Sequence, residues 1–155
     1  MATDNGCTLQ IAMNSTTPPV LPVDLLNAIV PVKKFYGTST QLEGGSKILT
    51  ALNKVWAPSL YEVSNYTSEE FPLYSSEGNY YMAFASLGHT VDNFGALCNI
   101  GKSQDGSASI GRNVWLRSLK DFSATSALII NTLNGNPKGS NYVNSENAVC
   151  PCFCL

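Results

Sequence analysis

The chain has 155 residues, a formal net charge of −2, 44% hydrophobic residues and only 13% charged residues. This length suits a single domain, residues 1–155, with a sizeable core, and the apolar content excludes a disordered chain. The net charge excludes a strongly basic, histone-like packager of nucleic acid, and no stretch approaches the roughly 20 apolar residues of a membrane-spanning helix.

Ser, Thr and Asn take the place of charge on the predicted surface. Such a surface is typical of subunits covered by copies of themselves, and equally of secreted, lectin-like proteins. The N-terminal residues "MATDNGCTLQ" lack the basic and apolar regions of a signal peptide, which predicts a cytoplasmic chain. In a cytoplasm the two glycosylation sequons, at Asn14 and Asn65, carry no meaning.

Apolar residues recur at helical spacing in four segments. The first is "VDLLNAIV", bounded by Pro22 and Pro31, and the second runs from the capping candidate Ser46 to Trp56 and cannot pass Pro58. The third lies within "NYYMAFASLGHTVDNF", residues 79–94. The fourth and longest covers 111–134, with a stripe formed by Trp115, Leu119, Phe122, Ser126, Ile129 and Leu133.

These segments predict an all-α fold, an antiparallel four-helix bundle. Residues 58–75 are expected to form an extended, proline-bounded connection, although their aromatic and β-branched content is also compatible with short strands. Residues 99–110 are expected to form a Gly/Ser-rich loop. The ends of the chain, 1–20 and 136–155, are rich in Pro, Asn, Ser and Gly and are predicted to be irregular.

No constellation typical of catalysis is visible. His89 is the only histidine, "IGKS" lacks the rest of a phosphate-binding loop, and the adjacent carboxylates Glu69 and Glu70 suit a solvated turn better than an acid–base pair. The sequence therefore predicts a protein that is not an enzyme and that has no cofactor.

Five cysteines include three in the tail "CPCFCL", and their spacing fits no zinc site, so no metal is predicted. The last four residues, beginning at Cys152, formally match a prenylation box, which would make the chain a lipid-anchored adaptor. No polybasic segment precedes the box, and a single lipid anchors weakly. A free, exposed tail is the preferred interpretation.

Basic residues are concentrated near the fourth predicted helix. Lys102, Arg112, Arg117 and Lys120 fall within nineteen positions, and the last three spread over the helix face opposite Trp115, with Ser118 beside them. A basic face of this kind binds the phosphates of a nucleic acid when many subunits bind one polymer. The competing interpretation is a solvated face paired with Asp121.

The order of the predicted elements, together with one motif, resembles the coat proteins of rod-shaped plant RNA viruses, the tobamovirus-like family. The motif is "VWAPS" at residues 55–59, followed at the family's spacing by Glu70-Phe71 and Tyr74. Ser86-Leu87 and Asp92 match the third helix, "PVDLLNAI" looks like the first, and "LRSLKDF" to "KGSNYVNSEN" looks like the last helix and the turn after it.

The resemblance implies a virion coat protein that assembles helically in many copies and encapsidates single-stranded RNA without reading its sequence. Virion and host cytoplasm would then be its locations, and no membrane would be involved. By the same resemblance Arg117 and Ser118 match an RNA-proximal Arg-Ser pair, and Thr38 lies near a polar turn. Trp56, Phe71 and Tyr74 are expected to form an apolar cluster that fixes the connection to the bundle.

Two departures weaken the match to that family. Phe94 and Ala96 stand where the family has RNA-binding arginines, which shifts the expected RNA contacts to Arg112, Lys120 and Lys102. Lys54 stands where the family has a carboxylate used for disassembly. The main alternative is a β-rich secreted or carbohydrate-binding module, supported by the Ser, Asn and Gly content, the sequons and the aromatic residues at 61–81.

Overall fold

The fold is mostly β, which overturns the prediction of an all-α four-helix bundle. The computed structural model describes residues 13–14, 21–37, 48–66, 72–82, 113–120, 125–131, 136–142 and 144–155. Their helices are α2 (Val23–Ala28), α3 (Leu60–Ser64) and a 3-10 turn (Pro72–Ser76), and their strands are β1 (Val32–Gly37), β2 (Ile48–Asn53), β3 (Val114–Leu119), β4 (Ser126–Ile130), β5 (Gly139–Tyr142) and β6 (Ala148–Val149).

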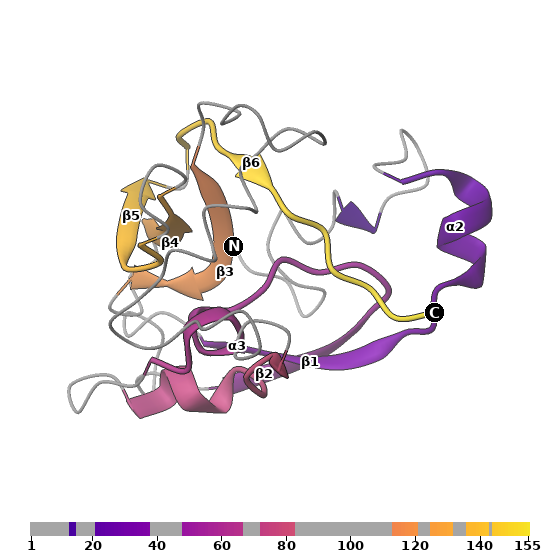
Figure 1. The fold of residues 1–155 in the computed structure, drawn as a ribbon, viewed down its shortest axis with the longest axis horizontal. Helices are drawn as coiled ribbons and strands as arrows, with labels where there is room; N and C mark the ends of the chain where they lie inside the picture. The colour runs from indigo at the N-terminus through magenta and orange to yellow at the C-terminus, as the bar shows by residue number, and fades with distance from the viewer. Residues whose placement is uncertain are drawn as a thin grey trace.

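The larger sheet has four strands in the order β5-β4-β3-β6 (Figure 1). The two pairs β5–β4 and β4–β3 are antiparallel, and β6 lies parallel to β3 at the other edge. The β3–β4 register shifts between Trp115 and Leu119, which marks a bulge in the middle of β3. β3 is therefore an inner strand that is regular only at its ends.

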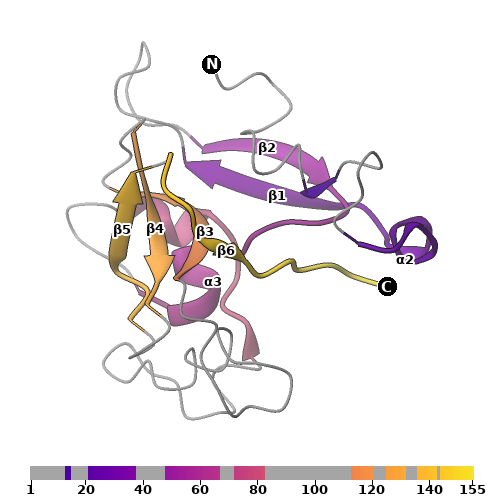
Figure 2. The same ribbon diagram turned by 90° about the horizontal axis from the view of Figure 1, so that it is seen from above.

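The smaller sheet is the antiparallel hairpin of β1 and β2, with Val32 opposite Asn53 and Gly37 opposite Ile48. Figure 2 shows this hairpin lying apart from the larger sheet. The helix predicted from Ser46 to Trp56 is wrong where the structure describes this segment, because residues 48–53 form strand β2. The partner strand, "VKKFYG", is not anticipated by any part of the sequence analysis.

The long helix predicted over 111–134 is also wrong in its described residues, which form β3 and β4. Five consecutive residues of β3, Val114 to Ser118, are buried, so both faces of the strand are covered. A strand of this kind has no polar face, and periodicity alone cannot distinguish it from a buried helix. The β-branched and aromatic residues within it, Val114 and Trp115, are the signal that favours a strand.

The first predicted helix is confirmed as α2, which begins directly after Pro22. The connection predicted over 58–75 is not simply extended, because it contains α3 and the 3-10 turn. Most of the third predicted helix lies outside the described residues, as do the loop at 99–110 and Phe71.

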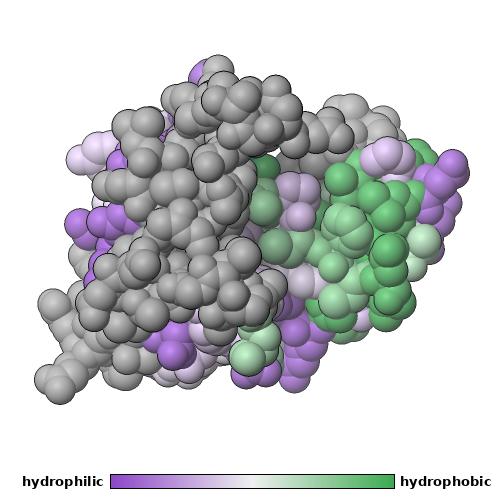
Figure 3. Space-filling model, viewed as in Figure 1, coloured by the Kyte–Doolittle hydropathy of each residue, from purple (hydrophilic) through white to green (hydrophobic). Residues whose placement is uncertain are grey.

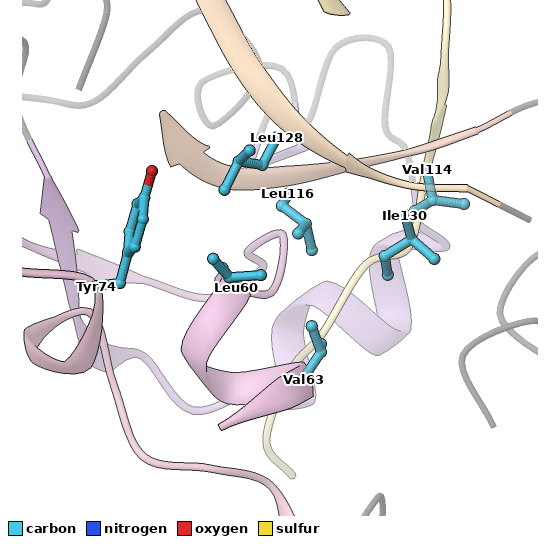
Figure 4. Close-up of a cluster of buried hydrophobic side chains, with 7 residues drawn as sticks. All are labelled: Leu60, Val63, Tyr74, Val114, Leu116, Leu128 and Ile130. Carbon is cyan, nitrogen blue, oxygen red and sulfur yellow. The ribbon is translucent and has the colours of Figure 1, made fainter. Parts of the chain in front are cut away.

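The main apolar core lies between the larger sheet and α3 (Figure 4). Side chains from β3 and β4 point toward Leu60 and Val63 of α3, and Tyr74 closes one end by donating a hydrogen bond to the carbonyl of Leu119, at 3.0 Å. The members of this core are Leu60, Val63, Tyr74, Val114, Leu116, Leu128 and Ile130.

A second apolar cluster joins α2 to the segment before α3 and contains Met13, Leu26, Ile29, Val55 and Ala57. Val149 and Phe153 from the C-terminal segment pack against this cluster, whereas Cys150 packs against the first. The C-terminal segment therefore connects the two clusters.

The C-terminal tail was predicted to be free and irregular, and this prediction is wrong, because the tail is part of the fold. β5 and β6 extend the larger sheet, and Cys152 forms an antiparallel bridge with Trp56 through two backbone hydrogen bonds of 2.8 and 3.0 Å. The backbone N–H of Val30 donates to the carbonyl of Cys154 at 3.0 Å. Figure 1 shows the tail running from β6 toward α2.

Apolar side chains gather on the surface over α2, where Figure 3 is green. Val23, Val30 and Leu155 are among the exposed large apolar residues of the described chain. Clustered apolar surface often marks contacts with other molecules. Assembly of this chain into a particle of many copies stays a prediction.

The core assignment can be tested with two leucines in opposite environments. Leu116 is 1% exposed in the main core, and Leu52 of β2 is 75% exposed. We expect Leu116→Ala to lower the free energy of unfolding by about 2 to 5 kcal/mol, because it leaves a cavity. We expect Leu52→Ala to change it by less than about 0.5 kcal/mol. Urea unfolding followed by the fluorescence of the buried Trp56 and Trp115 measures both, and similar costs would contradict this core.

Candidate ligand-binding site

A pocket of about 410 Å³ opens beside β1. Its lining comes from β1, from the segment that follows the 3-10 turn, and from Glu62 of α3. The lining residues are Lys33, Lys34, Phe35, Glu62, Gly78, Asn79, Tyr80, Tyr81 and Met82. Three aromatic rings and several fixed polar groups therefore surround one space.

A buried ion network adjoins this pocket through Lys34 and Glu62, which are both lining residues. The Glu62 carboxylate forms ion pairs with the Lys34 ammonium through Oε1 and with the Arg117 guanidinium through Oε2. Glu62 is fully buried, Arg117 is 7% exposed and Lys34 is 9% exposed. Buried charges remain ionised only when they are paired, so these three side chains depend on one another.

Local sequence explains the position of Glu62. Ser59-Leu60-Tyr61-Glu62 is a capping box: the Ser59 hydroxyl accepts from the Glu62 N–H at 3.2 Å, and Glu62 Oε2 accepts from the Ser59 N–H at 3.0 Å. This reciprocal pair begins α3. It also fixes the carboxylate so that the remaining lone pairs face Arg117 and Lys34.

The bulge in β3 explains the position of Arg117. At this residue the backbone N–H donates to the carbonyl of Pro58 at 3.0 Å, while neighbouring parts of β3 pair with β4. The guanidinium then donates to the carbonyls of Phe35 and Ala57, each at 3.0 Å, and to the carbonyl of Glu77. Bulges redirect side chains in this way. Arg117 therefore connects β1 with α3, with the segment before α3 and with the segment after the 3-10 turn.

A second buried carboxylate, Glu77, lies beside this network. Its Oε1 accepts from the backbone N–H of Gly37 at 3.0 Å, and its Oε2 accepts from the Ser118 hydroxyl. The same hydroxyl accepts from the N–H of Leu60 at 2.8 Å. Glu77 and Arg117 therefore bind two backbone groups of β1, the N–H of Gly37 and the carbonyl of Phe35.

The two carboxylates differ in their titration. Burial alone would raise the pKa of Glu62, but the hydrogen bond and charge of Arg117, and then those of Lys34, hold it below its ordinary value. Burial raises the pKa of Glu77 above its ordinary value, against the lowering effects of the Ser118 hydrogen bond and the Arg117 charge. Glu62 is therefore the permanent anion of the network.

Aromatic groups surround the Lys34 ammonium. Its Nζ lies 4.6 Å from the centre of the Trp56 ring and 5.7 Å from the centre of the Tyr81 ring. Trp56 Nε1 donates to the Tyr81 hydroxyl at 2.9 Å, which fixes the two rings relative to each other. These contacts stabilise the cation where it meets the pocket.

Gly78 lets the chain pass directly over the Glu62 carboxylate. Its φ is +156°, and a Cβ at this position would overlap the carboxyl group. Only glycine meets both conditions without strain. The close approach places Asn79, Tyr80 and Tyr81 along the wall of the pocket.

The structure separates the residues that the sequence analysis proposed for RNA binding. Arg117 and Ser118 are buried in the network, Lys120 is exposed just beyond β3, and Arg112, Lys102 and Thr38 lie outside the described residues. Of the proposed apolar cluster, Tyr74 belongs to the main core and Trp56 contacts Lys34 and Tyr81, while Phe71 lies outside the described residues. RNA binding by these residues stays a prediction.

Sequence reasoning missed Lys34, Glu62, Glu77 and the pocket aromatics. The capping-box pattern "SLYE" was the available signal for Glu62 and α3. Nothing in the sequence indicates that Lys34 and Glu77, 43 positions apart, share one site.

No group of three or more His, Cys, Asp or Glu side chains that could hold a metal ion occurs among the residues the structure describes. Cys150 and Cys152 lie near each other in the tail, and the hydrogen bond from Cys152 lowers the pKa of Cys150 to about 7. Within the described ranges no helix has the length and apolar character needed to cross a membrane.

Comparison with known families places the chain in one of them. Residues 2–155 match the family described as a domain of unknown function (DUF6273), so the chain belongs to that family. No curated protein and no solved structure matched it. These comparisons give no support to the resemblance to plant-virus coat proteins, which stays a prediction.

The unequal roles of the two buried glutamates can be tested by matched substitutions. We expect Glu62→Gln to lower the free energy of unfolding by about 3 to 5 kcal/mol, because it leaves buried cations without their anion. We expect Glu77→Gln to cost about 1 to 2 kcal/mol, because a neutral amide keeps part of its hydrogen bonding. Urea unfolding near pH 7 measures both values. Equal costs would show that Glu62 is not the anion on which the network depends.

The pH dependence of stability gives an independent test. Because the pKa of Glu77 in the folded state is raised above its ordinary value of 4.5, this group contributes its full stability only below pH 4.5. That contribution is lost as the pH rises through the folded-state pKa. We therefore expect the destabilisation caused by Glu77→Gln to become smaller as the pH rises above 4.5, because the unsubstituted protein loses this contribution and the amide does not titrate. For Glu62, whose pKa is lowered, stability is lost as the pH falls below 4.5. A stability difference for Glu77→Gln that stays constant with pH would contradict this assignment.

Proposed function

We propose that this member of the family is a carbohydrate-binding module whose ligand occupies the pocket beside β1. The observation that supports the proposal is the combination of Phe35, Tyr80 and Tyr81 with the exposed polar side chains of Asn79 and Lys33 around one space. Small-molecule sites combine these features: apolar and aromatic walls, with a few positioned polar groups that orient the ligand.

Carbohydrates match this combination chemically. A sugar ring has apolar C–H faces, which pack on aromatic rings, and a rim of hydroxyls, which need hydrogen-bond partners. The pocket has aromatic rings, and its lining includes both hydrogen-bond donors and hydrogen-bond acceptors. Lys34 and Glu62 of the lining are held in place by the ion network, so these side chains lose little conformational entropy on binding.

The hypothesis of an RNA-encapsidating coat protein has less support. It was based on the order of four helices, and the described residues of two of those segments are strands. Arg117 and Ser118, the pair it assigned to RNA, use their polar groups inside the protein. The fold agrees better with the alternative, a β-rich binding module.

Substitution of a pocket tyrosine tests the proposal. We expect retarded migration of the purified protein in native gels that contain at least one soluble polysaccharide from a panel of neutral and acidic polymers. Tyr80→Ala should weaken that retardation about three- to tenfold, because one aromatic contact is lost.

Tyr142→Ala is the matched control, because Tyr142 is 69% exposed on β5 and does not line the pocket. It should leave the retardation unchanged. Absence of retardation with every polysaccharide, or equal effects of the two substitutions, would contradict the proposal.

A further inference from the structure

We infer that the ligand of this pocket is an acidic saccharide, one whose sugar ring carries a carboxylate. The inference rests on the proposed function and adds the chemical class of the ligand. It is based on the charged side chains around the pocket and on the lysines that lie close to its aromatic rings.

Among the described residues that line the pocket, two are cationic, Lys33 and Lys34, and one is anionic, Glu62. Lys34 and Arg117 contribute two positive charges, which Glu62 and Glu77 can at most balance. Lys33 adds a further positive charge at the rim: it is exposed, and no carboxylate of the described residues forms an ion pair with it.

The lysines also lie close to the aromatic rings that would otherwise attract a cation. Lys33 Nζ lies 5.8 Å from the centre of the Phe35 ring, and Lys34 Nζ lies over the rings of Trp56 and Tyr81. A cationic ligand would compete with these ammonium groups and be repelled by them. An anionic group meets them favourably, and a cleft with one sign of charge concentrates ligands of the opposite sign.

Lys33 is the group best placed to bind the carboxylate. Lys34 is already engaged by Glu62, whereas Lys33 is exposed on the adjacent position of β1. Successive residues of a strand point to opposite faces, so Lys33 shares a face with Phe35 and Lys34 points into the network. A sugar packed against Phe35 would then present its carboxylate to the Lys33 ammonium.

Three pairs of methyl glycosides test the inference: glucuronide with glucoside, galacturonide with galactoside, and mannuronide with mannoside. The members of each pair differ only in a carboxylate or a hydroxymethyl group. We expect the acidic member of at least one pair to bind about tenfold more tightly in calorimetric titration, because hydrogen bonds to charged groups are stronger than neutral ones. Sodium acetate serves as the anion without a sugar.

Lys33→Gln should reduce the preference for the acid about three- to tenfold, with little effect on the neutral glycoside. Because Lys33 is exposed, this substitution leaves the core intact. Lys120→Gln is the matched control: it removes the same charge from an exposed lysine that does not line the pocket, and it should keep the preference.

The outcomes separate this inference from the proposed function. Equal or tighter binding of the neutral glycosides would leave the carbohydrate-binding function in place and overturn the acidic ligand. A preference for the acid that Lys33→Gln and Lys120→Gln reduce equally would also overturn it. Absence of binding by every glycoside, or acetate binding as tight as that of the acids, would overturn both.

Discussion

The ion pair between Arg117 and Glu62 is the interaction on which the rest of the described structure depends. Arg117 comes from the larger sheet and Glu62 from α3, and the same guanidinium also holds backbone carbonyls of β1 and of the segments before α3 and after the 3-10 turn. Removing these charges from water is costly, and the cost is offset only because almost every hydrogen-bonding position is filled. In the described chain, Asn147 Nδ2 is the one buried side-chain polar atom without a partner.

This pair also explains how a binding pocket is formed from short elements. α3 has five residues, and it is the ion network that attaches it to the hairpin. With Glu62 fixed, Lys34 is drawn beneath Trp56 and Tyr81, and Gly78 lets the next segment close over the carboxylate. The pocket walls are therefore positioned by the same contacts that stabilise the fold.

Part of this arrangement could be predicted from the sequence, and physical reasons explain why the rest could not. α2 was predictable because two prolines delimit a short apolar stripe, and α3 could have been found from its capping box. β3 and β4 were mistaken for one helix because their burial on both faces removes the alternation that identifies a strand. Arg117 and Ser118 were assigned to RNA binding by resemblance to a family. Their partners in the structure, Glu62 and Glu77, lie 55 and 41 positions away, beyond the reach of local patterns.

The coupling between Arg117 and Glu62 is the most direct test of this account. It can be measured by a double-mutant cycle of urea unfolding with Arg117→Gln, Glu62→Gln and the double substitution. Arg117→Gln leaves Glu62 with Lys34 as its remaining cation, and Glu62→Gln leaves Arg117 without its carboxylate partner. The cost of the double substitution should therefore be smaller than the sum of the two single costs, by about 2 kcal/mol or more. Costs that add within about 0.5 kcal/mol would show that the two side chains do not interact, and that Arg117 is available to an external partner.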